Sequence, residues 1–304
     1  MLYNIKTFIL LSLVLISLNG YAVPSGIKVL SDISYGKDAD QTLDVYIPAD
    51  AKDAPVIFMI HGGAWSGGDK AIKAEFENKV AHWVTRGFIF ISTNYRTLPK
   101  IGPIGQAKDV EAALLVAQQR VGEWGGSPEK FILMGHSAGA HLVSLISSNY
   151  STITGNEIIP WLGTVSMDTS TYDVVKRLTS QKDSEFYKER FGENPDYWQK
   201  ASPFYALNDK LPPFLAVCSR RSDDACIESK NFIKKAKDLG THVEILAVDL
   251  SHGEINSELG KGSCYTSNVD DFLKTLSPEI ASMFTSQDSR MKKNCAGDRG
   301  VNGA

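Results

Sequence analysis

The chain has 304 residues, of which 43% are hydrophobic and 22% are charged. This composition is that of an ordinary globular protein and allows one large α/β domain or two smaller ones. The formal net charge is only −3. It gives no reason to expect a nucleic acid or an anionic membrane surface as a partner.

The first 22 residues have the pattern of a secretory signal peptide. Lys6 precedes the almost continuously apolar run Thr7–Leu18, and Gly20-Tyr21-Ala22 supplies the small residues of a cleavage site. The run is shorter than the roughly 20 residues of a comfortable membrane span. We therefore expect cleavage after Ala22, export to the periplasm or the medium, and no stable membrane association afterwards. An uncleaved membrane anchor is the alternative.

Apolar runs along the rest of the chain predict eight β-strands. They cover Ile27–Tyr35, Thr42–Ile47, Val56–Ile60, Phe88–Thr93, Phe131–Met134, Leu162–Met167, Phe214–Cys218 and Val243–Val248. The middle runs are typical of parallel strands buried on both faces, whereas the first two alternate and suit an antiparallel edge. Helical patterns separate the later runs, at Ala71–Arg86, Gln106–Trp124, Ala138–Ser147, Ala225–Leu239 and Ser267–Phe284. This alternation predicts a doubly wound α/β fold with a mostly parallel eight-stranded sheet.

Two stretches depart from the alternation. Residues 169–210 are rich in charged and aromatic side chains, and we expect them to form a small cap over the strand ends. Residues 286–304 are polar and without periodicity, which predicts a flexible tail. The main domain is therefore expected to span residues 23–285, without internal repeats or a linker between two domains.

Gly135-His136-Ser137-Ala138-Gly139 reads G-x-S-x-G and directly follows the apolar run Phe131–Met134. A strand that turns sharply at a serine and continues into a helix is the setting in which this pattern indicates a nucleophile. The two glycines suit a strained turn where side chains would clash with the neighbouring strand and helix. Ser137 is the predicted nucleophile.

A serine hydroxyl needs a base that removes its proton, and the base needs an acidic partner. His252 follows the last predicted strand and therefore lies at the edge of the sheet where ligands bind. A solvent-facing loop histidine is the alternative for His252. The other five histidines have more ordinary places: His136 beside the serine, His141 in the next helix, His82 and His242 away from strand ends, and His61 in a further motif.

The acid is expected between serine and histidine in chain order. The loop after Phe214–Cys218 offers Asp223 and Asp224. We prefer Asp224, with Asp223 as the cap of the following helix, although the two roles are exchangeable. Asp168, after an earlier strand, is a third option for which a structural role is favoured.

His61-Gly62-Gly63-Ala64-Trp65 follows the buried run Val56–Ile60. Two glycines let the backbone turn its amides toward the serine, where a side chain would block the approach. We expect an oxyanion hole made of the N–H groups of Gly63, Ala64 and Ala138.

Export makes the four cysteines candidates for disulfides. Cys218 and Cys226 are eight positions apart and suit a small closed loop, which leaves Cys264 and Cys295 as a possible second pair. Four cysteines allow three pairings, and the sequence does not choose among them. Free buried thiols are the alternative.

Together these motifs resemble the α/β-hydrolase superfamily, in its carboxylesterase/lipase branch with an HGG-type oxyanion loop. The resemblance covers roughly Ile27–Leu276, and small esterases and aryl formamidases share the HGG-x-W variant. It implies a Ser-His-Asp mechanism with an acyl-enzyme and no cofactor or metal. One departure is that Cys218-Ser219 stands where the family usually has His-Gly before the acid, and the loop that follows is longer.

The expected function is therefore hydrolysis of small-molecule carboxylic esters with short-chain or aryl groups. Trp65 is a possible pocket residue, although packing of the cap onto the core is the simpler role for it and for the other aromatic residues nearby. An aryl formamidase-type amide hydrolase is the alternative enzyme, against which export argues. A catalytically silent hydrolase fold that only binds ligands is a third possibility. The oligomeric state and the physiological ester are left open.

Overall fold

The computed structural model of the chain describes residues 24–153, 157–180 and 184–284. The predicted signal peptide (1–22), the predicted tail (286–304) and Cys295 lie outside these residues, as does the side chain of Asp223. Within the described ranges, none of the helices is apolar over a length sufficient to cross a bilayer.

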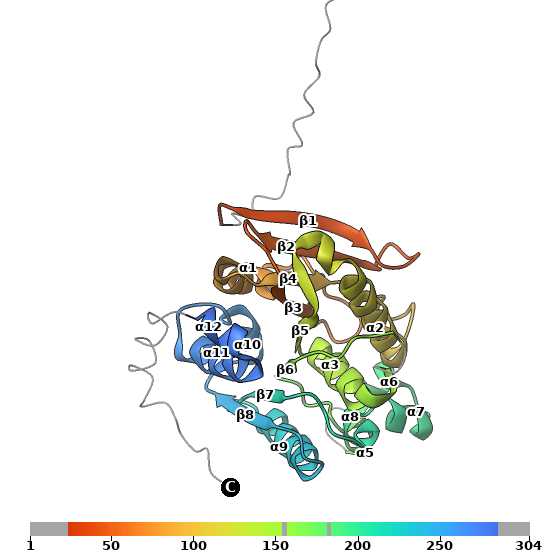
Figure 1. Cartoon of the computed structure of the whole chain (residues 1–304). Helices are drawn as coiled ribbons and strands as arrows, with labels where there is room; N and C mark the ends of the chain where they lie inside the picture. Colours follow the sequence, from red (N-terminus) through yellow and green to blue (C-terminus); the bar gives the residue numbers. More distant parts are fainter. Residues whose placement is uncertain (1–23, 154–156, 181–183, 285–304) are drawn as a thin grey trace, which may run out of the picture.

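An eight-stranded sheet forms the centre of the fold, in the order β1-β2-β4-β3-β5-β6-β7-β8 (Figure 1). The strands are β1 (Ile27–Ser34), β2 (Thr42–Pro48), β3 (Ala54–Ile60), β4 (Ile89–Thr93), β5 (Gly126–His136), β6 (Gly163–Met167), β7 (Phe214–Ser219) and β8 (Val243–Val248). Strands β3 to β8 are parallel, and β2 is antiparallel to both of its neighbours. The predicted doubly wound, mostly parallel α/β sheet with an antiparallel edge is confirmed.

Helices cover both faces of this sheet (Figure 1). They are α1 (Lys73–Trp83), α2 (Pro103–Arg120), α3 (Ala138–Ser148), α4 (Tyr150–Ile153), α5 (Val174–Thr179), α6 (Ser184–Phe191), α7 (Pro195–Lys200), α8 (Pro203–Ala206), α9 (Asp223–Asp238), α10 (His252–Ser257), α11 (Cys264–Leu276) and α12 (Pro278–Ser282), with 3₁₀ turns at Val84–Arg86 and Val121–Trp124. The predicted helix Ser267–Phe284 is in fact two helices. Pro278 has no N–H to continue α11, so this helix ends at Leu276. Ser277 then caps the new helix α12.

The central strands are buried on both faces because an apolar layer lies on each side. Phe58 and Ile60 of β3 face the layer under α2 and α3, whereas Ile57 and Met59 face the layer under α1, α10 and α11. Strand β7 divides in the same way, with Phe214 packed against α9. This two-sided burial explains why these strands read as continuous apolar runs.

The register of the strands brings three loops together at one edge of the sheet. Ile60 pairs with Gly135, and His136 pairs with Met167. The residues that follow β3, β5 and β6 therefore leave the sheet side by side. This is the carboxyl edge of the parallel strands, where open α/β sheets bind their ligands.

Residues 169–210, between β6 and β7, contain the short helices α5 to α8. They lie next to α3, on the side of the sheet that α2 and α3 cover (Figure 1). Their aromatic residues Tyr187 and Phe191 pack against Trp65, which follows β3. The insertion thus borders the loops at the carboxyl edge.

Candidate active site

Ser137 stands at the sharp turn between β5 and α3. Its φ is +55° and its ψ is −116°, a strained conformation that non-glycine residues seldom adopt. A Cβ on Gly135 would lie 2.4 Å from the Gly139 oxygen, and one on Gly139 would lie 2.2 Å from the Ile60 oxygen. Both glycines are therefore required by the close contact of strand, turn and helix, as the G-x-S-x-G pattern predicts.

Three side chains from separate elements form one chain of hydrogen bonds at this turn. The Nε2 atom of His252 is 2.9 Å from the Ser137 Oγ atom. The Nδ1 atom of the same ring is 2.7 Å from Oδ2 of Asp168. A neutral imidazole that donates from Nδ1 to the carboxylate presents its Nε2 lone pair to the serine hydroxyl.

Asp168 directly follows β6 and is held by the backbone around it. Its φ is +55°, its own N–H donates to the Val217 carbonyl over 2.8 Å, and its side chain is 3% exposed. The Ser219 N–H donates to Oδ1 of Asp168, also over 2.8 Å. Oδ1 of Asp168 thus accepts a hydrogen bond from a fixed backbone N–H, and Oδ2 accepts one from the ring of His252.

The structure corrects our preference for Asp224 as the partner of the histidine. Asp224 lies in the first turn of α9, and its Oδ2 atom is 3.2 Å from Nη1 of Arg177. After Ser219 the backbone continues alongside β8, where the Arg220 N–H donates to the Val248 carbonyl. This path leads to α9 and leaves Asp168 as the carboxylate bonded to the ring. The side chain of Asp223, the exchangeable alternative, lies outside the described part of the chain.

The turn after β3 approaches the elbow as closely as its glycines allow. A Cβ on Gly62 would lie 3.1 Å from both the His136 oxygen and the Ser137 Cβ. Gly63 has a φ of +127°, and Ala64 follows with +52°. The carbonyl of Gly63 accepts from the amides of Ser66 and Gly67, which closes the turn. The backbone after β3 is therefore fixed beside the serine.

Trp65 continues this turn with a φ of +59°, and its side chain is buried. Its indole N–H donates to Nδ1 of His141 over 3.1 Å, so the Nε2–H of His141 is the donor to the Ala201 carbonyl, over 2.8 Å. Burial lowers the pKa of His141 to about 4 and keeps the ring neutral. His141 therefore connects the turn after β3 to the insertion, a role that the sequence did not reveal.

His136 lies against the other side of the site. Its ring centroid is 4.6 Å from that of His252, and its Nε2–H donates to the His252 carbonyl over 2.9 Å. Burial, and then the neighbouring His252, lower the pKa of His136 to about 3. The ring thus stays neutral and adds no positive charge beside His252.

A cavity of about 190 Å³ opens directly at the serine. Its walls come from the turn after β3, the elbow, the end of β6 and helix α6, and its lining includes Ala64, Trp65, Ser137, Asp168, Thr169, Ser170, Thr171, Phe186, Tyr187 and His252. The His252 side chain is 55% exposed, so the reacting atoms are accessible from solvent. Hydroxyl groups and aromatic rings thus face one space together with the three bonded side chains.

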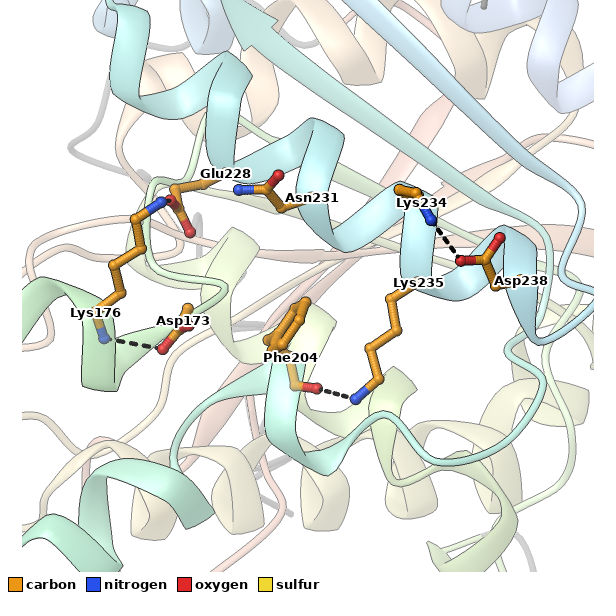
Figure 2. Close-up of a pocket in the computed structure, with 8 residues that line it drawn as sticks. All are labelled: Asp173, Lys176, Phe204, Glu228, Asn231, Lys234, Lys235 and Asp238. Atoms are coloured by element: carbon orange, nitrogen blue, oxygen red, sulfur yellow. Dashed lines mark hydrogen bonds and ion pairs between the residues drawn. The ribbon is translucent and has the colours of Figure 1, made fainter.

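A second hollow, of about 350 Å³, lies between α5, α8 and α9 (Figure 2). Its charged groups already have protein partners. Lys235 donates to the Phe204 carbonyl over 2.7 Å, Lys234 pairs with Asp238, and Lys176 pairs with Glu228 over 2.5 Å. This surface groove contains no nucleophile beside a base, so the smaller cavity is the candidate active site.

One predicted disulfide is present. Cys218 and Cys226 are joined and close a loop from the end of β7 to α9. Cys264 is disulfide-bonded as well, whereas Cys295 lies outside the described residues. Among those residues no cysteine is a free thiol. The loop closed by Cys218–Cys226 includes Ser219, whose amide holds Asp168.

The BD-FAE family model matches residues 43–233, from β2 to α9. This is more than half of the chain and includes Ser137 and Asp168. The chain belongs to the BD-FAE family. His252, on α10, lies beyond the matched part of this BD-FAE chain.

Curated relatives have esterase names. A probable isoprenylcysteine alpha-carbonyl methylesterase (ICME) of Oryza sativa subsp. japonica is 36% identical over 118 residues, which is 38% of this BD-FAE chain and 28% of the relative. Esterase LipC of Mycobacterium tuberculosis is 26% identical over 220 residues, 67% of this chain and 54% of the relative. The chain thus spans about half, or less, of the length of these relatives.

A solved structure has the same fold. Esterase B from Lactobacillus rhamnosis in an inhibited form superimposes with a TM-score of 0.66 at 19% identity, and the match covers 90% of this chain and 92% of that one. At this identity the likeness shows the α/β-hydrolase fold, which agrees with the sheet order and the helix layers of this protein.

Proposed function

We propose that this BD-FAE protein is a serine carboxylesterase. The observation that carries the proposal is the hydrogen-bonded chain from Ser137 through His252 to Asp168, at the mouth of a cavity. The esterase names of the curated relatives support the same reaction class. Because the match covers only part of those relatives, their own substrates are not transferred to this protein.

In the proposed first step, Nε2 of His252 takes the proton of the Ser137 hydroxyl as its Oγ atom attacks the ester carbonyl. Asp168 accepts the hydrogen bond from Nδ1 throughout and stabilises the imidazolium. The negative charge that develops on the carbonyl oxygen would be bound by the N–H groups of Gly63, Ala64 and Ala138.

Collapse of the tetrahedral intermediate breaks the bond to the leaving alcohol, which takes the proton from His252 and departs. An acyl group then remains on Ser137. Water, deprotonated by the same histidine, attacks this acyl-enzyme, and the acid leaves as the serine regains its proton.

We further propose esters with a short acyl chain or an aryl group as substrates. A cavity of about 190 Å³ suits a small or flat group better than a long acyl chain. Trp65, Phe186 and Tyr187 supply aromatic surface to it. The disulfide Cys218–Cys226 and the leader-like sequence of residues 1–22 support export to an oxidising compartment as part of the proposal.

Hydrolysis of p-nitrophenyl acetate by the purified protein tests this function. Ser137→Ala should reduce kcat/KM by at least about 1,000-fold and prevent labelling by a fluorophosphonate. Ser148→Ala is the matched control, because that hydroxyl bonds only within α3, to the Ser144 carbonyl. Full activity or full labelling of Ser137→Ala would refute the proposal.

A further inference from the structure

A network of buried polar groups lies beneath the candidate active site and joins α1 to α10. Glu75 and Lys79, one turn apart on α1, are 5% and 0% exposed, and Asn256 of α10 is 4% exposed. Burying such groups costs free energy unless each has partners. Their positions therefore call for an explanation beyond packing.

Lys79 is bonded to the end of the helix that begins with His252. Its ammonium donates to the Asn256 carbonyl and to Oδ1 of Asn256, both over 2.8 Å, and to the Ala74 carbonyl over 2.6 Å. All three N–H bonds of the charged group are thus used. A positive charge at the last carbonyls of a helix also has a favourable interaction with the helix dipole.

Side chains from α1 and α11 donate hydrogen bonds to the last three carbonyls of α10. Tyr265 donates to the Ile255 carbonyl over 2.9 Å, Lys79 to that of Asn256, and Asn78 to that of Ser257 over 2.7 Å. These carbonyls would otherwise lack partners within so short a helix. Helix α10 is therefore fixed at the end opposite to His252.

Glu75 extends the same network to the turn after β3. Its Oε1 atom accepts from the Gly62 N–H over 3.4 Å, just before the amides proposed to form the oxyanion hole. Burial raises the pKa of Glu75 and lowers the pKa of Lys79 to about 8, and the attraction between the two groups opposes both shifts. This buried pair of titratable side chains thus contacts both the turn after β3, at Gly62, and helix α10, at Asn256.

We propose that Glu75 and Lys79 are positioning residues that set the turn after β3 and His252 at the distance from each other that the reaction requires. The inference rests on the proposed esterase function. It accounts for two buried charges that do not themselves line the cavity. Both act through other groups, Glu75 through Gly62 and Lys79 through Asn256.

The test separates positioning from simple stabilisation. Lys79→Met keeps the apolar stem and removes the donor to Asn256. We expect kcat on p-nitrophenyl acetate to fall about 10- to 100-fold, with KM changed less than about threefold, because a displacement near 1 Å costs on that order. The reason for the split is that the alignment of reacting groups changes while the cavity walls do not.

Two further variants make the result independent of stability. Glu75→Gln combined with Lys79→Met removes both buried charges, so this protein should regain part of the stability lost in Lys79→Met while kcat stays low. His82→Leu is the matched control on the same helix, because it breaks the buried bond between His82 and Asp270, 2.9 Å long and away from the site. It should lower the melting temperature without lowering kcat.

A folded Lys79→Met protein with the kcat of the wild type would overturn the inference, as would a double variant in which kcat recovers together with stability. An equal loss of kcat in His82→Leu at equal stability would also overturn it. In each of these cases the wild type still hydrolyses the ester, and the proposed function stands. A wild type that neither hydrolyses the ester nor reacts with a fluorophosphonate would refute the function and this inference together.

Discussion

Replacement of Asp168 by asparagine tests the site most directly. Asparagine has one oxygen where aspartate has two, and both carboxylate oxygens are in use. The Ser219 N–H belongs to the backbone and remains a donor, so the asparagine oxygen should turn toward it. The amide NH₂ then faces Nδ1 of His252 and forces the proton onto Nε2, which leaves no lone pair for the Ser137 hydroxyl.

The expected loss follows from this wrong tautomer. A serine hydrolase whose histidine is held in that form loses about 10³- to 10⁴-fold in rate, or about 4–5.5 kcal/mol of transition-state stabilisation. Asp224→Asn is the matched control, since its carboxylate pairs with Arg177 and not with the ring. It should keep kcat/KM within about threefold of the wild type.

Steady-state hydrolysis of p-nitrophenyl acetate measures both variants, with circular dichroism to establish that each is folded. The same preparations are titrated with a fluorophosphonate, which counts reactive Ser137. If folded Asp168→Asn keeps more than a tenth of the activity while Asp224→Asn loses most of it, Asp168 is not the acid that supports His252.

Two further predictions concern stability. Removing the disulfide by Cys218→Ser with Cys226→Ser should lower the free energy of unfolding by about 2–3 kcal/mol from the closed loop alone. It should also reduce kcat several-fold, because the Ser219 amide holds the carboxylate of Asp168, the proposed acid. Chemical denaturation measures the loss of stability and steady-state kinetics the loss of activity. An unchanged kcat would contradict the second expectation. For His141, the folded pKa of about 4 lies below the ordinary 6.5, so the unfolded chain takes up a proton first as the pH falls. Stability should therefore be unaffected above pH 6.5 and decline by about 2–3 kcal/mol between pH 6.5 and 4.5 from this group, and urea unfolding of His141→Gln should show a smaller decline over that interval.

Much of the fold is readable from the sequence because burial on both faces leaves a simple signal. The eight strands stand out as apolar runs, and the antiparallel edge as alternation in β1 and β2. Helix α10 did not stand out in the sequence, because it is only six residues long. It depends on a capping box between Ser251 and Glu254 and on side chains from α1 and α11. Its end is formed by contacts between residues that are far apart in the chain.

The carboxylate that bonds to His252 could not be identified from the sequence for the same reason. Asp168 and Asp224 both follow buried strands, and chain order admits either. What distinguishes them is the left-handed backbone at Asp168 and the amide of Ser219, neither of which a sequence displays. The available clue was position, because Asp168 comes directly after the strand adjacent to the elbow, whereas Asp224 is separated from its strand by a longer loop.

The polar contacts between α1 and the end of α10 have a consequence for the way the chain can be divided. The proposed nucleophile Ser137, the carboxylate of Asp168 and the turn after β3 all precede residue 169, and His252 alone comes from the last quarter of the sequence. A break in the exposed turn at Gly240, between α9 and β8, would give a large fragment with Ser137 and Asp168 and a small one with β8, α10 to α12 and His252. Strand β8 would pair again with β7, and Asn78 and Lys79 would bind the end of α10, so that ester hydrolysis would report whether the two fragments restore the proposed site.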